Sequence, residues 1–311
     1  MSISVNNLTK KFGTQRAVDN ISFEVKTGEI VGFLGPNGAG KTTTMKILTC
    51  YMAPSDGDAK ILNLSVLENQ DEIKKKIGYL PENNPLYHEM PVLEYLKFVA
   101  ELQGVKKENI SKRISEMVHV CGLNIEKHKK IGELSKGYRQ RVGLAQAMIH
   151  DPEILILDEP TTGLDPNQIV EIRKLIKELG KHKTVILSTH ILPEVEATCD
   201  RILIINQGKI VADGTTDMLR KSAQGQEVLR VQIGEPEIRD QVMNSLKLLS
   251  SVSLVDFDKE SKNSFIVNSK NDLSSRKDIF NLCVSKNWIL TEMTPIETKL
   301  EDIFRELTTI N

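Results

Sequence analysis

Hydrophobic and polar positions in the first 215 residues form a series of strand and helix patterns. Partial alternation predicts strands over Ile3–Val5 and Ile21–Val25, and an apolar run at residues 29–34 predicts a third strand. Residues 41–51 have a helical composition that ends before a proline. From residue 82 to residue 150, apolar residues at helical spacing among Glu and Lys predict a mostly helical subdomain.

Two short apolar runs follow, Ile154–Leu157 and Thr184–Leu187. Neither run alternates with polar residues, which is typical of parallel strands buried on both faces. The residues between them, 168–179, have the composition of a connecting helix, and a turn at 206–208 predicts a hairpin over 201–212. This succession predicts an α/β core with a mainly parallel sheet.

The pattern changes after a polar stretch at residues 215–226, which is predicted to be a linker. Beyond it the order is strand, helix, strand, strand, helix and strand, which predicts a small α+β module of ferredoxin-like topology. The predicted strands are 228–233, 252–257, 264–268 and 289–292, and the predicted helices are 237–249 and 274–286. We therefore expect two domains in the 311 residues, 1–220 and 227–311.

Composition narrows the possible partners. The formal net charge of −1 argues against a sequence-wide attraction to nucleic acid, so no nucleic-acid partner is expected. Four cysteines lie far apart without metal-ligand spacing, as in reducing compartments. The N-terminus lacks the apolar core of a signal peptide, and no run approaches the roughly 20 apolar residues of a membrane span. A cytoplasmic protein is predicted, and any work on a membrane would need another chain.

A phosphate-binding loop is the first chemical motif. The spacing G-x-x-x-x-G-K-T comes directly after an apolar strand and before a helix, where backbone N–H groups can wrap phosphates. Lys41 is expected to reach the outer phosphates, and the Thr42 hydroxyl to bind Mg²⁺. The nucleotide-binding residues are Gly35, Pro36, Asn37, Gly38, Ala39, Gly40, Lys41, Thr42 and Thr43.

Two consecutive carboxylates end the buried run at residues 154–157. Asp158 is predicted to hold Mg²⁺ directly or through water. Glu159 points elsewhere and is the candidate base that orients and deprotonates the attacking water. Taken alone, Glu159 would be read as a solvated surface carboxylate, but its position beside Asp158 and the phosphate-binding loop favours the catalytic role.

Further motifs in the same order resemble the ATP-binding cassette family. Residues 134–138, Leu-Ser-Lys-Gly-Tyr, resemble the family signature LSGGQ, with departures at Lys136 and Tyr138. The resemblance implies that Ser135 and Gly137 of one subunit close over the γ-phosphate held by a second subunit. Since the chain carries one phosphate-binding loop and one signature, a head-to-tail homodimer around two ATP molecules is expected.

The resemblance assigns roles to four more residues. Asp165, in the segment Gly-Leu-Asp, corresponds to a loop that crosses the dimer interface, and His190 to a switch histidine at the γ-phosphate. Phe12 corresponds to the aromatic residue that stacks on adenine. Glu82 stands where the family has Gln at the metal, so an extra negative charge is expected to tune Mg²⁺ binding or coupling.

The resemblance also implies a membrane partner. Residues 84–91 fall where relatives receive a helix of the membrane subunit, and the ending, 298–307, resembles export-type cassette ATPases. The N-terminal half most resembles the gliding-motility branch. We therefore predict an ATP-hydrolysing subunit, with ATP and Mg²⁺ as cofactors, peripheral on the inner face of the membrane and driving an integral-membrane permease.

Three alternatives belong to other classes. A cassette machine acting on ribosomes or DNA would usually carry two cassettes or a long coiled-coil insertion. A regulatory module that binds ATP without hydrolysis would not need Glu159 and His190. A kinase with a phosphate-binding loop would need an acceptor pocket and would lack the segment at residues 135–137.

Overall fold

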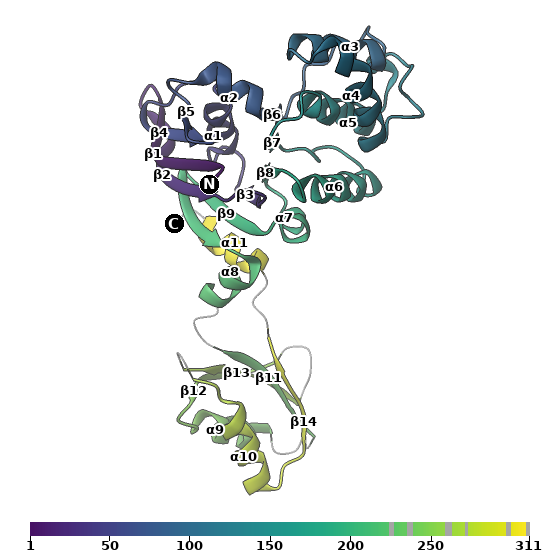
Figure 1. The fold of residues 1–311 in the computed structure, drawn as a ribbon. Helices are drawn as coiled ribbons and strands as arrows, with labels where there is room; N and C mark the ends of the chain where they lie inside the picture. The colour runs from purple at the N-terminus through teal and green to yellow at the C-terminus, as the bar shows by residue number, and fades with distance from the viewer. Residues whose placement is uncertain (224–226, 235–238, 259–262, 271–272, 297–299, 309–311) are drawn as a thin grey trace. The chain divides into compact units, whose positions relative to one another are not determined.

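The computed structural model describes residues 1–311 except 224–226, 235–238, 259–262, 271–272, 297–299 and 309–311 (Figure 1). The chain forms two compact units. One unit contains Met1–Thr216 together with Leu307–Asn311, and the other contains Asp217–Glu306. The division falls near the boundary at residue 220 that the sequence predicts. Each unit is described by itself.

A six-stranded sheet is the centre of the first unit, which we call the cassette. Its strand order is β10-β9-β3-β8-β7-β6, with β10 antiparallel and the other five strands parallel. All residues of β3, β7 and β8 are buried, as the unalternating apolar runs predict. The strands are β3 (Ile30–Leu34), β6 (Ile77–Leu80), β7 (Ile154–Asp158), β8 (Thr184–Thr189), β9 (Arg201–Asn206) and β10 (Lys209–Gly214).

A second, antiparallel sheet has the order β2-β1-β4-β5. Its strands are β1 (Ile3–Phe12), β2 (Gln15–Val25), β4 (Asp56–Ile61) and β5 (Leu64–Ser65). The predicted strand at Ile3–Val5 is too short, because β1 continues to Phe12. Register shifts after Val5 and Leu8 interrupt the alternation of buried and exposed residues, and Asn7 has a φ of +50°. These bulges explain why the pattern alone does not reveal the rest of the strand.

The helices of the cassette cover the sheets and form the predicted helical subdomain (Figure 1). That subdomain contains α3 (Val92–Leu102), α4 (Lys107–Val120), a 3₁₀ turn at Ile131–Glu133 and α5 (Lys136–Met148). Its apolar residues form one core with Leu155, Leu157 and Leu187 of the parallel sheet. The other cassette helices are α1 (Lys41–Leu48), α2 (Gln70–Lys76), α6 (Pro166–Gly180) and α7 (Leu192–Thr198).

The second unit contains a four-stranded antiparallel sheet of order β12-β13-β11-β14. The predicted succession of strands and helices is present. The elements are β11 (Val228–Ile233), α9 (Arg239–Lys247), β12 (Val252–Phe257), β13 (Ser264–Ser269), α10 (Arg276–Lys286) and β14 (Leu290–Pro295). One apolar core joins the sheet to both helices, with Phe265, Leu246 and Ile279 fully or nearly fully buried.

The predicted linker at 215–226 contains the division between the two units, but most of it is helical. Residues 216–223 form a helix, α8 (Thr216–Ala223), and residues 224–226 lie outside the described part. Leu219 is 5% exposed, so this mostly polar segment has an apolar side that is buried. The closing helix, α11 (Leu300–Thr308), ends in the cassette unit, where Asn206 Nδ2 donates a hydrogen bond to the Leu307 carbonyl at 3.2 Å.

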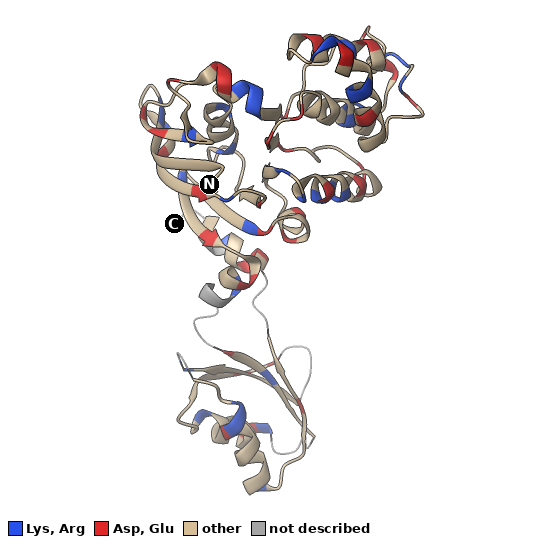
Figure 2. Cartoon of the chain, viewed as in Figure 1, with Lys and Arg blue, Asp and Glu red and all other residues tan. Residues whose placement is uncertain are grey.

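Surface chemistry shows no preference for one sign of charge. In the ribbon of Figure 2, the positions of acidic and basic residues are interspersed along the helices of each unit, in keeping with the net charge of −1. Among the helices in the described ranges, none has the length and apolar character that crossing a membrane requires.

Candidate functional site

The phosphate-binding loop joins the end of β3 at Leu34 to the start of α1 at Lys41. Two of its glycines have no room for a side chain. A Cβ at Gly35 would lie 2.4 Å from the Ile205 carbonyl oxygen, and one at Gly40 would lie 2.4 Å from the Ala17 carbonyl oxygen. Gly40 also has a φ of +109°, a conformation that L-residues with side chains rarely adopt. The loop geometry therefore requires glycine at both positions.

Lys41 is buried under this loop, with an exposed fraction of 6%. Its Nζ donates to the carbonyl oxygens of Gly35 at 2.8 Å and Pro36 at 3.2 Å. The same ammonium lies 3.4 Å from Glu159 Oε1. A cation held in this way can meet phosphate oxygens inside the loop.

Glu159 lies at the turn that follows β7 and has a φ of +50°. Its backbone N–H donates to the Ser188 carbonyl oxygen at 3.0 Å, which fixes the turn to β8. Its carboxylate accepts from Thr162 Oγ1 at 3.2 Å, and its Oε2 lies 2.9 Å from His190 Nδ1. The structure thus brings together the three predicted catalytic residues, Lys41, Glu159 and His190.

Asp158 is fully buried at the carboxyl end of β7. Burial is the largest influence on its carboxyl group and raises the pKa, although the hydroxyls of Ser188 and Thr42 act in the opposite direction. Ser188 Oγ donates to Oδ1. Thr42 faces the same carboxylate, but Oδ2 accepts no hydrogen bond of good geometry from the described residues. A buried anion with an open oxygen beside a hydroxyl fits a hard cation such as Mg²⁺.

Few side chains near Asp158 and Thr42 could bind a metal ion. Within the described ranges, no group of three or more His, Cys, Asp and Glu residues could hold a metal ion without other ligands. This agrees with the way Mg²⁺ is usually bound, by one or two protein groups together with substrate phosphates and water.

Lys41, Thr42, Glu159 and His190 line a cavity of about 350 Å³ at the carboxyl edge of the parallel sheet, whereas Asp158 does not line it. Glu82, which stands where the resemblance implies Gln, lines the same cavity. Gly35, Pro36 and Ala39 belong to the loop but do not line the cavity. The lining residues are Ala17, Asn37, Gly38, Gly40, Lys41, Thr42, Thr43, Glu82, Glu159, Thr162 and His190.

Besides three residues of the loop, four further predicted nucleotide-binding residues do not line this cavity: Phe12, Ser135, Gly137 and Asp165. Phe12 is 50% exposed at the end of β1, and the Lys10 ammonium lies 5.5 Å from the centre of its ring. The other three lie at helix starts. None of these three lines the cavity of its own chain, so the cavity alone does not account for a nucleotide-binding role.

Ser135 and Asp165 have local structural roles. Ser135 Oγ accepts from the Tyr138 N–H at 3.3 Å and caps α5. Asp165 Oδ1 accepts from the N–H groups of Asn167 and Gln168, each at 3.0 Å, and caps α6. Capping accounts for a Ser and an Asp at these positions without any ligand.

Gly137 also has a reason within the chain. A Cβ at this position would lie 2.5 Å from Cδ of Gln168 in α6, so a larger residue would displace the end of that side chain. Sequence reasoning attributed the missing side chain to close approach of a second subunit. The structure adds an intrachain contact that any larger residue would disturb.

Sequence reasoning missed four residues that shape the site. Ala17 and Thr162 line the cavity, Ser188 bonds Asp158, and Glu194 bonds the threonines at 161 and 189. No local motif marks them, and the contacts of Ser188 with Asp158 and of Glu194 with Thr161 join segments about thirty residues apart. Of the four, only Ser188 could have been found from the sequence, because it is a polar residue in the interior of the buried strand β8.

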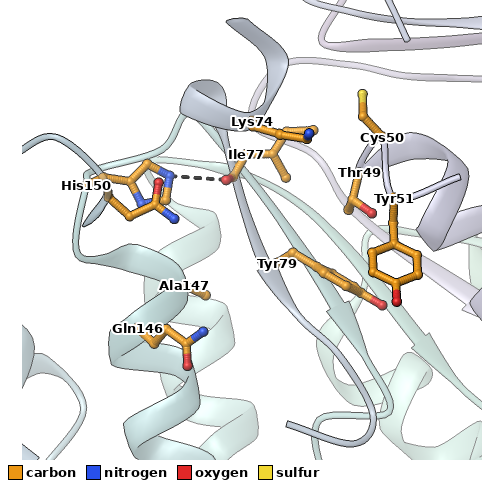
Figure 3. Close-up of a pocket in the computed structure, with 10 residues that line it drawn as sticks. Thr49, Cys50, Tyr51, Lys74, Ile77, Tyr79, Gln146, Ala147 and His150 are labelled. Carbon is orange, nitrogen blue, oxygen red and sulfur yellow. Dashed lines mark hydrogen bonds between the residues drawn. The ribbon is translucent and has the colours of Figure 1, made fainter. Parts of the chain in front are cut away.

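A second cavity, of about 390 Å³, lies between the end of α1, β6 and α5. Figure 3 shows Tyr51, Tyr79 and His150 around it, with His150 Nε2 bonded to the Ile77 carbonyl oxygen at 3.1 Å. His150 Nδ1 and the Tyr79 hydroxyl are buried and accept or donate no hydrogen bond among the described residues. Tyr51, at its rim, is 74% exposed.

A phosphate-binding loop, a buried acidic strand end and an adjacent carboxylate define the cassette as a P-loop nucleotide-binding domain of the α/β class. Comparison with known proteins identifies its family. The family model described as ABC transporter matches residues 18–162. A model described as an AAA domain, putative AbiEii toxin, matches residues 130–195 within the same unit.

Three relatives show the extent of the similarity. The chain is 33% identical over 302 residues to an uncharacterized ABC transporter ATP-binding protein of Bacillus subtilis, covering 97% of this chain and 98% of the relative. It is 35% identical to the bacitracin transport ATP-binding protein of Bacillus licheniformis, covering 98% and 96%. A solved dimeric cassette, MJ0796 bound to ADP and Pi, is 28% identical with a TM-score of 0.62, covering 68% of this chain and 98% of that one.

The chain therefore belongs to the ABC transporter family as an ATP-binding subunit. It is an ATPase that hydrolyses ATP to drive transport, as predicted. ATP-binding subunits of this family dimerise and pair with membrane permease components. The predicted P-loop α/β cassette is confirmed.

Proposed function

We propose that the cavity at the carboxyl edge of the parallel sheet is the hydrolysis site and that Glu159 is its base. The observation that carries the proposal is the convergence of Lys41 and His190 on the Glu159 carboxylate, at 3.4 Å and 2.9 Å. Lys41 binds the outer phosphates and exchanges its carbonyl contacts in the loop for phosphate oxygens. When nucleotide binds, the Lys41 ammonium therefore turns from the Glu159 carboxylate to the phosphates, and the carboxylate is free to act as a base.

Glu159 then orients water and takes its proton as the water oxygen attacks the γ-phosphorus, giving ADP and phosphate. His190 holds the base in place and donates to the γ-phosphate. Thr42 and Asp158 would hold Mg²⁺, which neutralises charge on the phosphates when it is bound. Glu82 lies on the wall of the same cavity, where its negative charge strengthens the attraction for the metal.

The working state is a head-to-tail homodimer in which Ser135, Gly137 and Asp165 of one subunit complete the site of the other. In support, all three lie outside their own chain's cavity, and one solved relative is a dimeric cassette with ADP and phosphate. Phe12 packs on adenine once nucleotide is bound, since its exposed ring is available for stacking.

The membrane partner docks at the second cavity, where Tyr51 and Tyr79 flank the space between the end of α1, β6 and α5 (Figure 3). Nearby, Tyr87 and Phe98 form an exposed aromatic pair with ring centres 5.7 Å apart. Exposed aromatic groups beside buried unpartnered polar atoms favour a protein interface. The chain then lies on the inner face of the cell membrane through its permease.

The transport is export. Relatives matched over at least three quarters of this chain include proteins named for bacitracin transport and for Nod factor export, and the predicted export-type ending agrees. The gliding-motility branch is a narrower proposal supported by sequence resemblance alone. The C-terminal unit is ferredoxin-like, a proposal supported by its strand order β12-β13-β11-β14 with two helices on one core.

The test is Glu159→Gln, which keeps the side-chain shape and removes the base. Turnover should fall by roughly 10²–10⁴-fold, while ATP affinity is retained. Mg-ATP should then trap a dimer that is visible by size-exclusion chromatography with light scattering. A variant that hydrolyses ATP at the parental rate would show that Glu159 is not the base.

A further inference from the structure

A buried carboxylate joins the two chain segments that carry Glu159 and His190. Glu194 is 2% exposed. Its Oε1 accepts from Thr161 Oγ1 at 2.6 Å, and its Oε2 accepts from Thr189 Oγ1 at 2.9 Å. Thr161 follows Glu159 by two residues, and Thr189 directly precedes His190. One side chain thus spans both segments.

The environment of Glu194 is dry. Thr161 is 2% exposed and Thr189 is fully buried. Across the part of the chain that the structure describes, no cation lies within ion-pair distance of Glu194. A carboxylate in such a place loses its hydration, so its two hydroxyl donors are the groups that stabilise the charge. The two hydrogen bonds therefore hold the segment that carries Glu159 and the segment that carries His190 at a fixed spacing from Glu194.

Glu194 itself is held by a rigid element. It lies in the first turn of α7, which packs against β3 next to the phosphate-binding loop. The contact is close, since a Cβ at Gly32 of β3 would lie 2.7 Å from Val195 Cγ1. On the other side, Thr189 Oγ1 accepts from the Ile191 N–H at 3.1 Å, so the turn around His190 is tied to the same group.

We propose that Glu194 is a positioning residue for hydrolysis. It holds the two loops at the spacing that places His190 Nδ1 2.9 Å from Glu159 Oε2. The inference rests on the proposed catalytic roles of Glu159 and His190. Because Glu194 does not line the nucleotide cavity, its loss should leave ATP binding intact and impair the chemical step.

A purely structural role makes a different prediction. An acidic residue in the first turn favours the helix dipole, and its removal would lower thermal stability alone. Under that alternative, kcat at a temperature well below unfolding would stay at the parental value.

The main experiment compares Glu194→Ala with Glu194→Gln. Alanine removes both contacts, whereas the amide of glutamine can accept from one hydroxyl and donate to the other. The expected loss of kcat is roughly 10–100-fold for alanine, because small misplacements of catalytic groups cost this much. Glutamine should recover most of that loss. Phosphate release gives kcat and KM, a fluorescent nucleotide gives Kd, and thermal unfolding is followed in parallel.

The two contacts are tested separately. Thr161→Val and Thr189→Val each remove one hydroxyl, and each should lower kcat several-fold, with Thr161→Ser and Thr189→Ser as matched controls. In the Glu194→Ala background neither valine should have a further effect, because the contact is already absent. Fully additive effects would overturn the proposal. If Glu194→Ala does not fold, the valine and serine pairs still decide it.

Glu159→Gln and His190→Ala are measured beside these variants. A parental rate for Glu159→Gln would overturn the catalytic assignment and the inference with it. An inactive Glu159→Gln together with a parental kcat for Glu194→Ala would overturn the inference alone. A lower kcat at unchanged Kd for ATP in Glu194→Ala, recovered by glutamine, is the expected result.

Discussion

The two sheets that form the cores of the units use their strand ends differently. In the cassette, parallel strands β3, β7 and β8 all end at one edge, and the residues that follow them meet in a single cavity. In the C-terminal unit, antiparallel strands end alternately at opposite edges. There, charged groups near strand ends pair locally, as Glu227 does with Arg276 at 2.8 Å. Parallel strands therefore concentrate chemistry, because successive carboxyl ends converge.

Of the changes that compare the two units, the largest expected effect comes from removing the buried cation of the cassette. Lys41→Ala deletes the charge that the phosphate-binding loop holds for the nucleotide, and a loss of hydrolysis of roughly 10²–10³-fold or more is expected, with weakened ATP binding. Arg276→Ala is the matched control, since it removes a cation paired with Glu227 from the start of α10 in the C-terminal unit. Nucleotide titration and phosphate release measure both. Equal losses in the two variants would contradict the contrast between the sheets.

A smaller but specific effect is expected at the start of α5. Ser135→Asp and Ser135→Asn both keep an oxygen that caps the helix, but only Asp adds a negative charge where the γ-phosphate of a second subunit is proposed to lie. The Asp variant should bind ATP as a monomer and fail to dimerise with Mg-ATP, while the Asn variant retains dimerisation. A substitution at Gly137 would test the same contact less specifically, because it would also displace the Gln168 side chain. Dimerisation of the Asp variant would count against the composite site.

Local pattern was enough to predict β3, β7, β8 and the phosphate-binding loop. Their apolar runs do not alternate, and the glycines of the loop recur at the spacing of a phosphate-binding motif. The carbonyl groups that exclude side chains at Gly35 and Gly40, however, belong to the distant residues Ile205 and Ala17. The second half of β1 escaped prediction because bulges interrupt its periodicity. Helix α8 escaped because one buried side, including Leu219, lies within a polar segment.

Other features of the site depend on contacts that no local window contains. Ser188 and Glu194 act through hydrogen bonds to residues about thirty positions away, Asp158 and Thr161. Gly137 was assigned to a contact between subunits because its fit against Gln168 is invisible without α6 in place. Motif spacing predicts groups that touch a ligand, whereas tertiary structure reveals the groups that position them.

The third prediction concerns the buried carboxylate at the end of β7. Burial raises the pKa of Asp158, so this group contributes stability that is present at low pH and is lost as pH rises through the raised pKa. Asp158→Asn should therefore increase the melting temperature of the nucleotide-free protein at pH 7. The difference should shrink as pH falls through the raised pKa.

The same variant should lose the stabilisation that the parental protein gains from Mg-ATP. Asp278→Asn is the control in the C-terminal unit, where the carboxylate also accepts from a serine hydroxyl, that of Ser251. Its response to Mg-ATP should equal the parental response. A lower nucleotide-free melting temperature for Asp158→Asn at pH 7 would contradict the assigned effect of burial.

The smallest effect on ATP binding is expected from removing the C-terminal unit. The structure places the end of the cassette at Thr216, where α8 begins, rather than at the predicted residue 220. A chain ending at Thr215 should fold and bind ATP with nearly parental affinity, since no described residue beyond Thr216 lines the nucleotide cavity. We propose that the unit tunes dimer contacts or coupling to the permease, so dimerisation, basal rate or stimulation by the partner should change.

Removing the C-terminal unit also removes one contact that stabilises the cassette. Leu307 returns to the cassette and accepts a hydrogen bond from Asn206, and a bond of this kind contributes about 0.5–1.5 kcal/mol. In a domain of this size, that corresponds to roughly 1–6 °C in melting temperature. Asn206→Ala in the full chain isolates the same contact and should reproduce that part of the loss. A shortened chain that is insoluble while Asn206→Ala is stable would mean that the cassette depends on more of the closing segment than this bond. A shortened chain that matches the full chain in every assay, with the permease present, would remove the regulatory role.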